Sequence, residues 1–388
     1  MAGVLTKAFF QRKFSLHLSI GGHQSQGMEV IMSLGRVTKW CRAGVLALSV
    51  LAAPAQAQVQ SVLPSSDYDS LATQVRAPRA NARIVEDAKV SAFELFRQGR
   101  FAAALELFQA ILTGRPREPR ALYGASLCLF NLQRTAEAET VAQMAIATAK
   151  KVAARKKNTA TRAVVLDQVA DALVLLGVVR AVQRDNEGAL RAVTEAVTLA
   201  PRHFDAQFAL GRARFGAGDP TGAATAFRAA IALQPNDARA RFFLATALEN
   251  ATDYAGATAA YRDLVNLAPN LADGHLGLGV LLVKAGGAQL AEGIIALQRA
   301  VALKGNLYEG RVTLGRALIQ AGRAAEAVEH LQNAAALSPA NPEPHFQLAQ
   351  AYRRLGRKAD ADAETEIVRQ LHEVRRKAGN QAPAIPQN

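Results

Sequence analysis

Hydrophobic and small residues recur through most of the chain with a period of 34 residues. From about Ile84, apolar stretches alternate with short polar turns such as "GAGDP" and "AGR". Prolines punctuate the pattern at Pro201, Pro235 and Pro269, and Pro339 follows after a small insertion. Because proline disfavours a helical conformation in the residue before it and suits the first turn of a helix, each proline region separates two helices. The pattern therefore predicts a series of helix pairs, one pair in each period.

Two small residues hold the same places in every repeat. The first lies ten residues after the punctuation point, and the second follows twelve positions later, or fourteen where "AGGAQL" inserts two residues. The first set is Ala92, Ser126, Gly177, Gly211, Ala245, Gly279, Gly315 and Ala349, and the second set is Ala104, Ala138, Ala189, Ala223, Ala257, Gly293, Ala327 and Ala361. A small residue on each helix allows the two axes to approach closely, so that larger neighbours interlock around the contact.

Larger residues flank the small positions in a regular way. A leucine precedes the first small residue in five repeats: Leu210, Leu244, Leu278, Leu314 and Leu348. Phe108, Phe227 and Tyr261 lie four residues after the second small residue, and we expect them to pack towards the next pair. Because one pair alone cannot bury its apolar faces, neighbouring pairs must stack.

This arrangement resembles the tetratricopeptide repeat family, whose pattern is Leu-Gly…Tyr…Ala…Phe…Ala…Pro. The repeat "RARFFLATALENATDYAGATAAYRDLVNLAPN" is similar to it in Leu244, Ala245, Tyr254, Ala257, Tyr261 and Pro269. The resemblance covers residues 85–377 and implies an all-α, right-handed α-solenoid of about eight helix-turn-helix units in an exported bacterial protein. We expect the units near residues 85–118, 119–152, 170–203, 204–237, 238–271, 272–307, 308–341 and 342–377.

Two parts of the repeat region depart from the pattern. About 17 extra residues, "KVAARKKNTATRAVVLD", separate the second and third units and predict an extended helix with a basic connection. The last unit, "KADADAETEIVRQLHEVRRK", carries a charged outer side, as a terminal cap needs.

The chain before the repeats has the features of an export signal. Residues 32–57 combine Arg36, Lys39 and Arg42, an uncharged run from Ala43 to Ala53, and a small-x-small ending, so we expect cleavage after Ala57. The 11-residue run is too short to cross a bilayer, which needs about 20 residues, so we expect no transmembrane helix in the mature chain. We interpret residues 1–31 as an over-extended N-terminus, 58–84 as a flexible leader and 378–388 as a disordered tail. These features predict a periplasmic or secreted protein.

Composition narrows the class of partner. The formal charge is +14, and removal of residues 1–57 leaves 40 Lys/Arg against 31 Asp/Glu, a charge of +9. This excess is smaller than that of a dedicated nucleic-acid binder, so nucleic acid is an improbable partner. Cys128 would be the single cysteine of the mature chain, and its apolar neighbours predict a buried, unreactive thiol.

The motifs that would indicate catalysis are missing from the sequence. It has no Gly-rich phosphate loop, no HExxH and no paired CxxC, and the histidines after the signal lie in different units without ligand spacing. We therefore expect neither an enzyme nor a bound cofactor or metal.

The resemblance implies a binding scaffold whose first helices line a concave face. Three residues before the small position the chain has Tyr123, Phe208, Phe242 and Phe346, and one residue after it Arg212 and Arg316. Such a groove suits an extended peptide or short helix with apolar and acidic side chains, for example in envelope assembly or secretion. The alternative is that the aromatic residues are packing residues.

A basic segment offers a second candidate surface. It comprises Lys150, Lys151, Arg155, Lys156, Lys157 and Arg162, with no acidic residue among them. It is either a solvated extension of a helix or a contact with an anionic polymer or membrane surface, in which case the protein would be a structural accessory.

Overall fold

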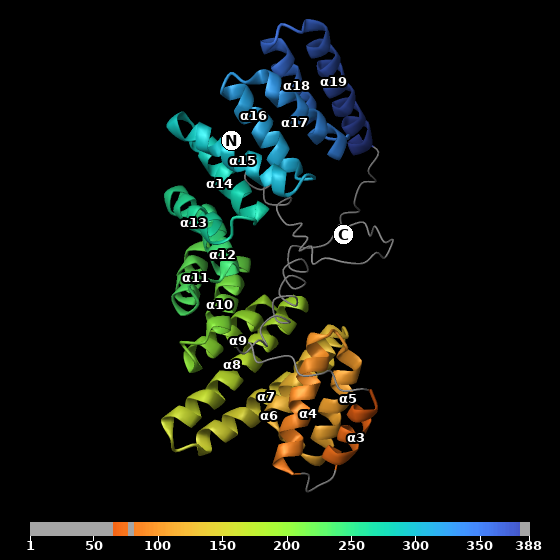
Figure 1. The fold of residues 1–388 in the computed structure, drawn as a ribbon, viewed down its shortest axis with the longest axis vertical. Helices are drawn as coiled ribbons and strands as arrows, with labels where there is room; N and C mark the ends of the chain where they lie inside the picture. The colour runs from red at the N-terminus through yellow and green to blue at the C-terminus, as the bar shows by residue number, and fades with distance from the viewer. Residues whose placement is uncertain (1–64, 77–80, 381–388) are drawn as a thin grey trace. The chain divides into compact units, whose positions relative to one another are not determined.

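The computed structural model describes residues 65–76 and 81–380, and these residues form α-helices joined by short turns, without a strand among them (Figure 1). The chain divides into two compact units, the first ending at Leu233 and the second beginning at Gln234. The helices of the first unit are α3 (Ser65–Arg76), α4 (Ala82–Arg97), α5 (Phe101–Gly114), α6 (Pro119–Asn131), α7 (Thr135–Arg155), α8 (Thr159–Val182), α9 (Asn186–Leu199), α10 (Phe204–Gly216) and α11 (Pro220–Leu233). Those of the second are α12 (Ala238–Asn250), α13 (Tyr254–Leu267), α14 (Ala272–Ala285), α15 (Leu290–Leu303), α16 (Tyr308–Gln320), α17 (Ala324–Leu337), α18 (Pro342–Arg354) and α19 (Lys358–Asn380), with a 3₁₀ turn η1 (Gly287–Gln289) before α15.

From α4 onward, consecutive helices form antiparallel pairs that stack in chain order within each compact unit. The prediction of an all-α solenoid built from about eight helix pairs is confirmed. A residue with a left-handed backbone stands in the turn inside each pair. It is a glycine in five of the pairs, and Gln133, Arg184 and Thr252 take its place in the other three.

The predicted close contact between small residues is present. All sixteen are buried. A Cβ atom added to Gly279 would lie 3.0 Å from the backbone oxygen of Gly293, its partner across the pair, and the Ser126 hydroxyl donates a 2.7 Å hydrogen bond to the Ala138 carbonyl. The helix axes therefore approach most closely where the sequence places its small residues.

Two of the three predicted aromatic contacts between neighbouring pairs are also present. The Phe108 ring on α5 lies directly over Gly124 of α6, and the Tyr261 ring on α13 lies over Gly277 of α14. Phe227 packs on Gly211 within its own pair, and its contact with the next pair, which belongs to the second compact unit, stays a prediction. Glycine provides the space that each ring occupies, because an added Cβ would lie less than 3 Å from ring atoms at all three positions.

The leader was expected to be flexible, and this expectation is wrong for residues 65–76. They form α3, which packs against α4 and α5 and buries Val75 with only 1% of its surface exposed. Leu71 and Ala72 pack against the same core. Leu71 and Val75 are four residues apart and so share one face of a helix, which is enough to dock this short segment.

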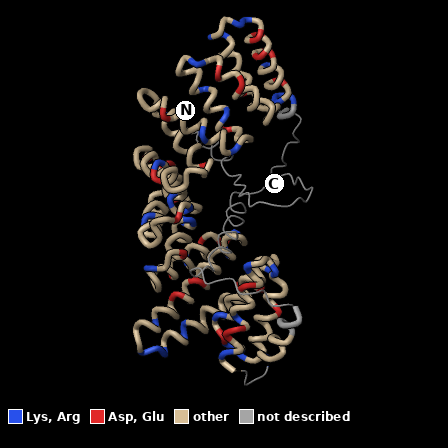
Figure 2. The backbone as a smooth tube through the Cα atoms, in the orientation of Figure 1, with Lys and Arg blue, Asp and Glu red and all other residues tan. Residues whose placement is uncertain are grey.

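The insertion between the second and third pairs lengthens α7 and α8 into a long hairpin. Helix α7 continues to Arg155 and α8 begins at Thr159, so only Lys156–Asn158 form the connection. Figures 1 and 2 show this turn at the free end of the hairpin, with Lys and Arg on both sides of it. The extended helix and basic connection were predicted correctly.

Cys128 is buried, and burial raises the pKa of its thiol to about 12, as an unreactive core cysteine requires. No helix within the described part of the chain is long and apolar enough to span a membrane. The predicted N-terminal extension and signal peptide, residues 1–31 and 32–57, lie outside the described residues. Helix α19 continues to Asn380, three residues into the predicted tail, and the remainder of that tail also lies outside them.

Candidate functional site

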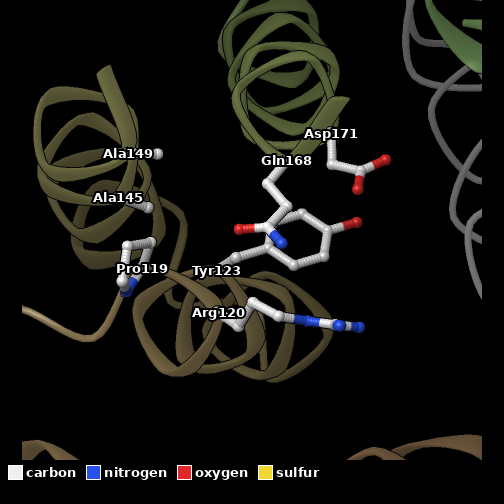
Figure 3. Close-up of a pocket in the computed structure, with 7 residues that line it drawn as sticks. All are labelled: Pro119, Arg120, Tyr123, Ala145, Ala149, Gln168 and Asp171. Carbon is white, nitrogen blue, oxygen red and sulfur yellow. The ribbon is translucent and has the colours of Figure 1, made fainter. Parts of the chain in front are cut away.

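The first helices of successive pairs form a continuous face in the first compact unit. Helix α4 contacts α6, α6 contacts α8, and α8 contacts α10. Side chains that point away from the second helices therefore come together on this surface, which we call the first-helix face. Its centre is Tyr123 of α6, which lies beside Asp171 of α8 (Figure 3).

An acidic and aromatic cluster surrounds Tyr123. The Tyr123 ring lies 6.5 Å from the Phe93 ring of α4, and the guanidinium of Arg120 lies 5.8 Å from the same Phe93 ring. On the other side, one carboxylate oxygen each of Asp171 and Asp205 and one ring nitrogen of His203 all lie within 4.8 Å of one another. Because α8 and α10 pack together, residues 32 to 34 positions apart in the sequence meet at one point.

His203 caps the N-terminus of α10 and also contacts Asp171. Its Nδ1 accepts a 3.3 Å hydrogen bond from the Ala206 N–H, and its Nε2 lies 3.2 Å from Asp171 Oδ1. A nitrogen that accepts a hydrogen bond carries no proton, so the proton of the neutral ring is on Nε2 and is donated to Asp171. The cap thus fixes the tautomer and holds one oxygen of the Asp171 carboxylate.

The carboxylates of the cluster raise the pKa values of His203 and Tyr123. Burial lowers the pKa of His203, but the hydrogen bond and charge of Asp171, together with the charges of Asp205 and Asp167, outweigh burial and raise it. Burial also raises the pKa of Tyr123 well above its usual value, and Asp171 and Asp205 raise it further. The positive charge of Arg120 acts in the opposite direction on Tyr123 and is too weak to offset the rest.

A small pocket of about 30 Å³ opens beside Tyr123. It is lined by Pro119, Arg120, Tyr123, Ala145, Ala149, Gln168 and Asp171, from helices α6, α7 and α8 (Figure 3). The volume suits one or two water molecules and is too small for a cofactor. The site is thus a shallow surface recess, of a kind suited to a side chain of a partner.

Sequence reasoning found Tyr123 but missed the carboxylates. Asp171 and Asp205 each lie six residues before the small residue of their helix, at Gly177 and Gly211, and Glu86, Asp273, Glu309 and Glu343 occupy the same place in other first helices. In most of these helices the position falls in the first turn, where a carboxylate stabilises the helix dipole. Asp171 is different because α8 begins twelve residues earlier.

Asp167 gives a second reason why Asp171 does not serve to stabilise helix α8. The two aspartates are four residues apart on α8, and like charges at this spacing destabilise a helix by about 0.2–0.5 kcal/mol. The shared register position of Asp171 and Asp205 was the signal from which these residues could have been found.

Asp171, His203 and Asp205 are also a possible set of metal ligands, whereas the sequence predicted none. The hydrogen bonds do not favour this use. A metal ion on Nε2 would require the proton to move to Nδ1, and the Nδ1 acceptor that caps α10 would then be lost. The observed geometry instead suits a proton shared between His203 and Asp171.

The other predicted groove residues of the first unit do not join this cluster. Phe208 is buried, stacking on Phe204 at 5.9 Å and packing against Phe227 at 5.7 Å, which favours the alternative of a packing residue. Arg212 is half-buried on α10. The expected preference of the groove for acidic side chains stays a prediction.

The predicted groove residues of the second unit lie on three separate helices. Phe242 of α12 is half-buried against the Tyr261 ring at 6.4 Å and acts largely as a packing residue. Arg316 of α16 is exposed, and so is half of Phe346 of α18. Helices α16 and α18 contact each other.

The basic residues gather at the turn of the α7–α8 hairpin. Lys150 is half-buried and pairs with Glu195 of α9. Lys151, Arg155, Lys156, Lys157 and Arg162 are exposed, and Val164 close by has 59% of its surface exposed. We call the six basic residues, from Lys150 to Arg162, the hairpin tip.

A larger pocket of about 460 Å³ lies in the second unit, and sequence reasoning missed it. It is lined by Tyr254, Ala255, Thr258, Arg262, Leu281, Lys284, Ala285 and Gln289. Gln289 belongs to η1, the turn that contains the two-residue insertion. The cations of this pocket already have partners, because Lys284 lies 3.9 Å from the centre of the Tyr254 ring and Arg262 binds both oxygens of Glu292.

Comparison with known structures supports the fold. The C-terminal part of a TPR repeat-containing protein from Cytophaga hutchinsonii is 16% identical, with a TM-score of 0.51 over 67% of this chain and 99% of that chain. MamA from Desulfovibrio magneticus is 20% identical, with a TM-score of 0.42 over 44% of this chain and 96% of that one. YrrB, described as a TPR protein with an unusual peptide-binding site, is 19% identical, with a TM-score of 0.43 over 47% and 93%. A search of curated proteins found no match.

Matches to protein-family models assign the chain to a family directly. A tetratricopeptide repeat model matches residues 92–153, 174–238 and 208–272, and a TPR repeat model matches residues 315–356. Together they cover slightly more than half of the chain, in register with the helix pairs. The chain belongs to the tetratricopeptide repeat family.

Proposed function

We propose that this protein is a non-enzymatic periplasmic or secreted scaffold that binds a segment of another protein along the first-helix face of its first compact unit. The observation that carries the proposal is the continuous surface of α4, α6, α8 and α10, on which Tyr123, Arg120 and Asp171 surround a recess. Family membership supports it, because arrays of this kind present extended binding surfaces. The export features of residues 32–57 support the compartment and a role in envelope assembly or secretion.

The binding face can be tested by capture of partners from envelope extract. The double variant Gln168→Ala/Asp171→Ala removes two side chains of the recess without touching the buried core. Its matched control, Glu187→Ala/Arg191→Ala, removes an exposed ion pair on the second helix α9. We expect the control to retain the partner of the wild-type protein and the recess variant to lose it. Equal recovery of one partner by all three proteins would contradict the proposal.

A second candidate function is contact of the hairpin tip with an anionic polymer or membrane surface. Exposed Lys and Arg side chains with an exposed valine at the end of a hairpin favour such a contact. We expect Lys156→Glu/Lys157→Glu to abolish salt-sensitive binding to anionic vesicles. Arg202→Glu/Arg228→Glu, an equal charge change at exposed sites elsewhere in the unit, should retain most of it. Unchanged binding of the Lys156/Lys157 variant would exclude the hairpin tip.

A further inference from the structure

The pocket of about 460 Å³ in the second compact unit lies outside the surface assigned to the proposed function. It is bounded by α13, by the C-terminal end of α14 and by η1. The short side chains of Ala255 and Ala285 leave space in its walls, and the buried Leu281 lines it with an apolar surface. The two-residue insertion lies at this point of the chain, so the pocket occurs where the repeat departs from its usual length.

The lining of this pocket is positively charged. Arg262 and Lys284 contribute to it, and no acidic residue of the described part of the chain lines it. The charge of Arg262 is balanced, because its Nε and Nη2 donate to the two carboxylate oxygens of Glu292 at 2.9 and 2.7 Å. The Lys284 ammonium lies 3.9 Å from the centre of the Tyr254 ring and forms no ion pair within the described residues. An aromatic ring attracts an ammonium group but carries no net charge, so the charge of Lys284 is left without a counter-ion.

Hydrogen-bond donors are also available at this end of the pocket. The Lys284 ammonium has three N–H groups. The side-chain amide of Gln289 lines the same pocket and makes no hydrogen bond within the described part of the chain. Asp253, the acidic residue that precedes Tyr254, instead accepts the Gly256 N–H and caps α13. One carboxylate could accept hydrogen bonds from both donors, because its two oxygens have about four lone-pair sites.

The exposure of the walls favours a segment of chain over a small molecule. Tyr254 has 43% of its surface exposed, and Lys284, Ala285 and Gln289 are exposed as well. A small-molecule site normally buries about 70–90% of its ligand, which walls as open as these do not provide. A protein segment needs to place only one or two side chains in the pocket while its backbone stays at the surface.

We propose that this pocket binds an acidic side chain, aspartate or glutamate, together with an adjacent apolar side chain from a segment of another protein. The carboxylate accepts N–H groups of Lys284 and Gln289, and the apolar side chain packs against Leu281 and Tyr254. The opposite charges of ligand and pocket favour this occupant. The site goes beyond the proposed function, because it belongs to the other compact unit.

The test begins with peptides selected on the intact wild-type protein from a random displayed library, after removal of those that also bind Ala285→Trp. This variant fills the pocket from an exposed position and leaves the core intact. We expect the selected peptides to contain an acidic residue. Its replacement by the corresponding amide in the tightest peptide should weaken binding about tenfold or more, as loss of a charge-assisted hydrogen bond does. Fluorescence anisotropy gives the dissociation constants.

A lysine variant and a matched control locate the charge that is recognised. Lys284→Gln should weaken the parent peptide to a similar extent and leave the affinity of the amide-substituted peptide unchanged. Lys358→Gln removes an exposed lysine elsewhere in the same unit and should bind the parent peptide as the wild type does. A far-UV circular dichroism spectrum establishes that Lys284→Gln is folded. If Lys284→Gln weakens both peptides equally, or the selected peptides lack an acidic residue, the carboxylate site is overturned.

The remaining outcomes identify other occupants. A wild-type dimer in size-exclusion chromatography that Ala285→Trp converts to a monomer would assign the pocket to a second copy of the chain and overturn the partner segment. Failure to select any peptide that distinguishes the wild type from Ala285→Trp would overturn it too. None of these variants alters the first-helix face, so such a failure leaves the proposed function standing.

Discussion

Replacing Gly124 with alanine tests how tightly the helix pairs are packed beside the site. Gly124 follows Tyr123 on α6, and the Phe108 ring of α5 covers it. A Cβ atom on residue 124 would lie 2.2 Å from the nearest ring carbon, whereas carbon atoms in contact lie about 3.5–4.0 Å apart. Phe108 is fully buried and packs 5.0 Å from the Phe93 ring, so it has no open space to move into.

The two opposing effects can be compared in magnitude. Overpacking of this severity costs about 3 kcal/mol, the upper part of the usual range. Alanine in place of glycine in a helix returns about 1 kcal/mol. We therefore expect Gly124→Ala to destabilise the protein by about 2 kcal/mol.

Gly216→Ala is the matched control. Gly216 is the last residue of α10, and an added Cβ there would meet nothing within 4 Å. The same substitution should leave stability unchanged or raise it by up to about 1 kcal/mol. Urea denaturation followed by far-UV circular dichroism gives both values. A Gly124→Ala protein as stable as the wild type would refute the packing described here.

Three further predictions follow from other features. Asp171 raises the folded-state pKa of His203, so His203 stabilises the fold most below its unfolded pKa of about 6.5, and this contribution is lost as the pH rises through the folded pKa. His203→Asn, which keeps a capping acceptor, should therefore lower the urea midpoint more at pH 5 than at pH 8. An equal effect at both pH values would contradict the raised pKa. Thr252→Gly should raise the free energy of unfolding by up to about 1–2 kcal/mol, since threonine at φ 64° is strained, and no gain would argue against this strain. Exported protein should begin at residue 58 and lack tryptophan fluorescence, because Trp40 is the single tryptophan; tryptophan emission from it would mean that the signal is retained.

The repeat architecture could be predicted because it is determined by residues at fixed positions within each repeat. A small residue at a fixed place on each helix defines where two axes meet, and this holds whatever the rest of the surface carries. Exposure of the aromatic residues could not be predicted in the same way. Tyr123 and Phe208 share a register position, yet Phe208 is buried because Phe204 stacks on it, whereas the equivalent residue before Tyr123 is Pro119.

The candidate site was partly predictable. Tyr123 was found from its register position, but its acidic neighbours come from α8 and α10, and their meeting depends on how the pairs stack. A carboxylate six residues before the small position recurs in most first helices, where a role in helix stability explains it equally well. Only the structure shows that α8 begins far upstream of Asp171, which removes that explanation.

The most direct test of the account is site-specific photo-crosslinking in cells that export the protein. A photoreactive amino acid at position 120 places the probe on the first-helix face, and one at position 191 places it on the exposed side of the second helix α9. The account predicts a crosslinked partner from position 120 and none from position 191. Crosslinking from position 191 alone would contradict the assignment of the binding surface to the first-helix face.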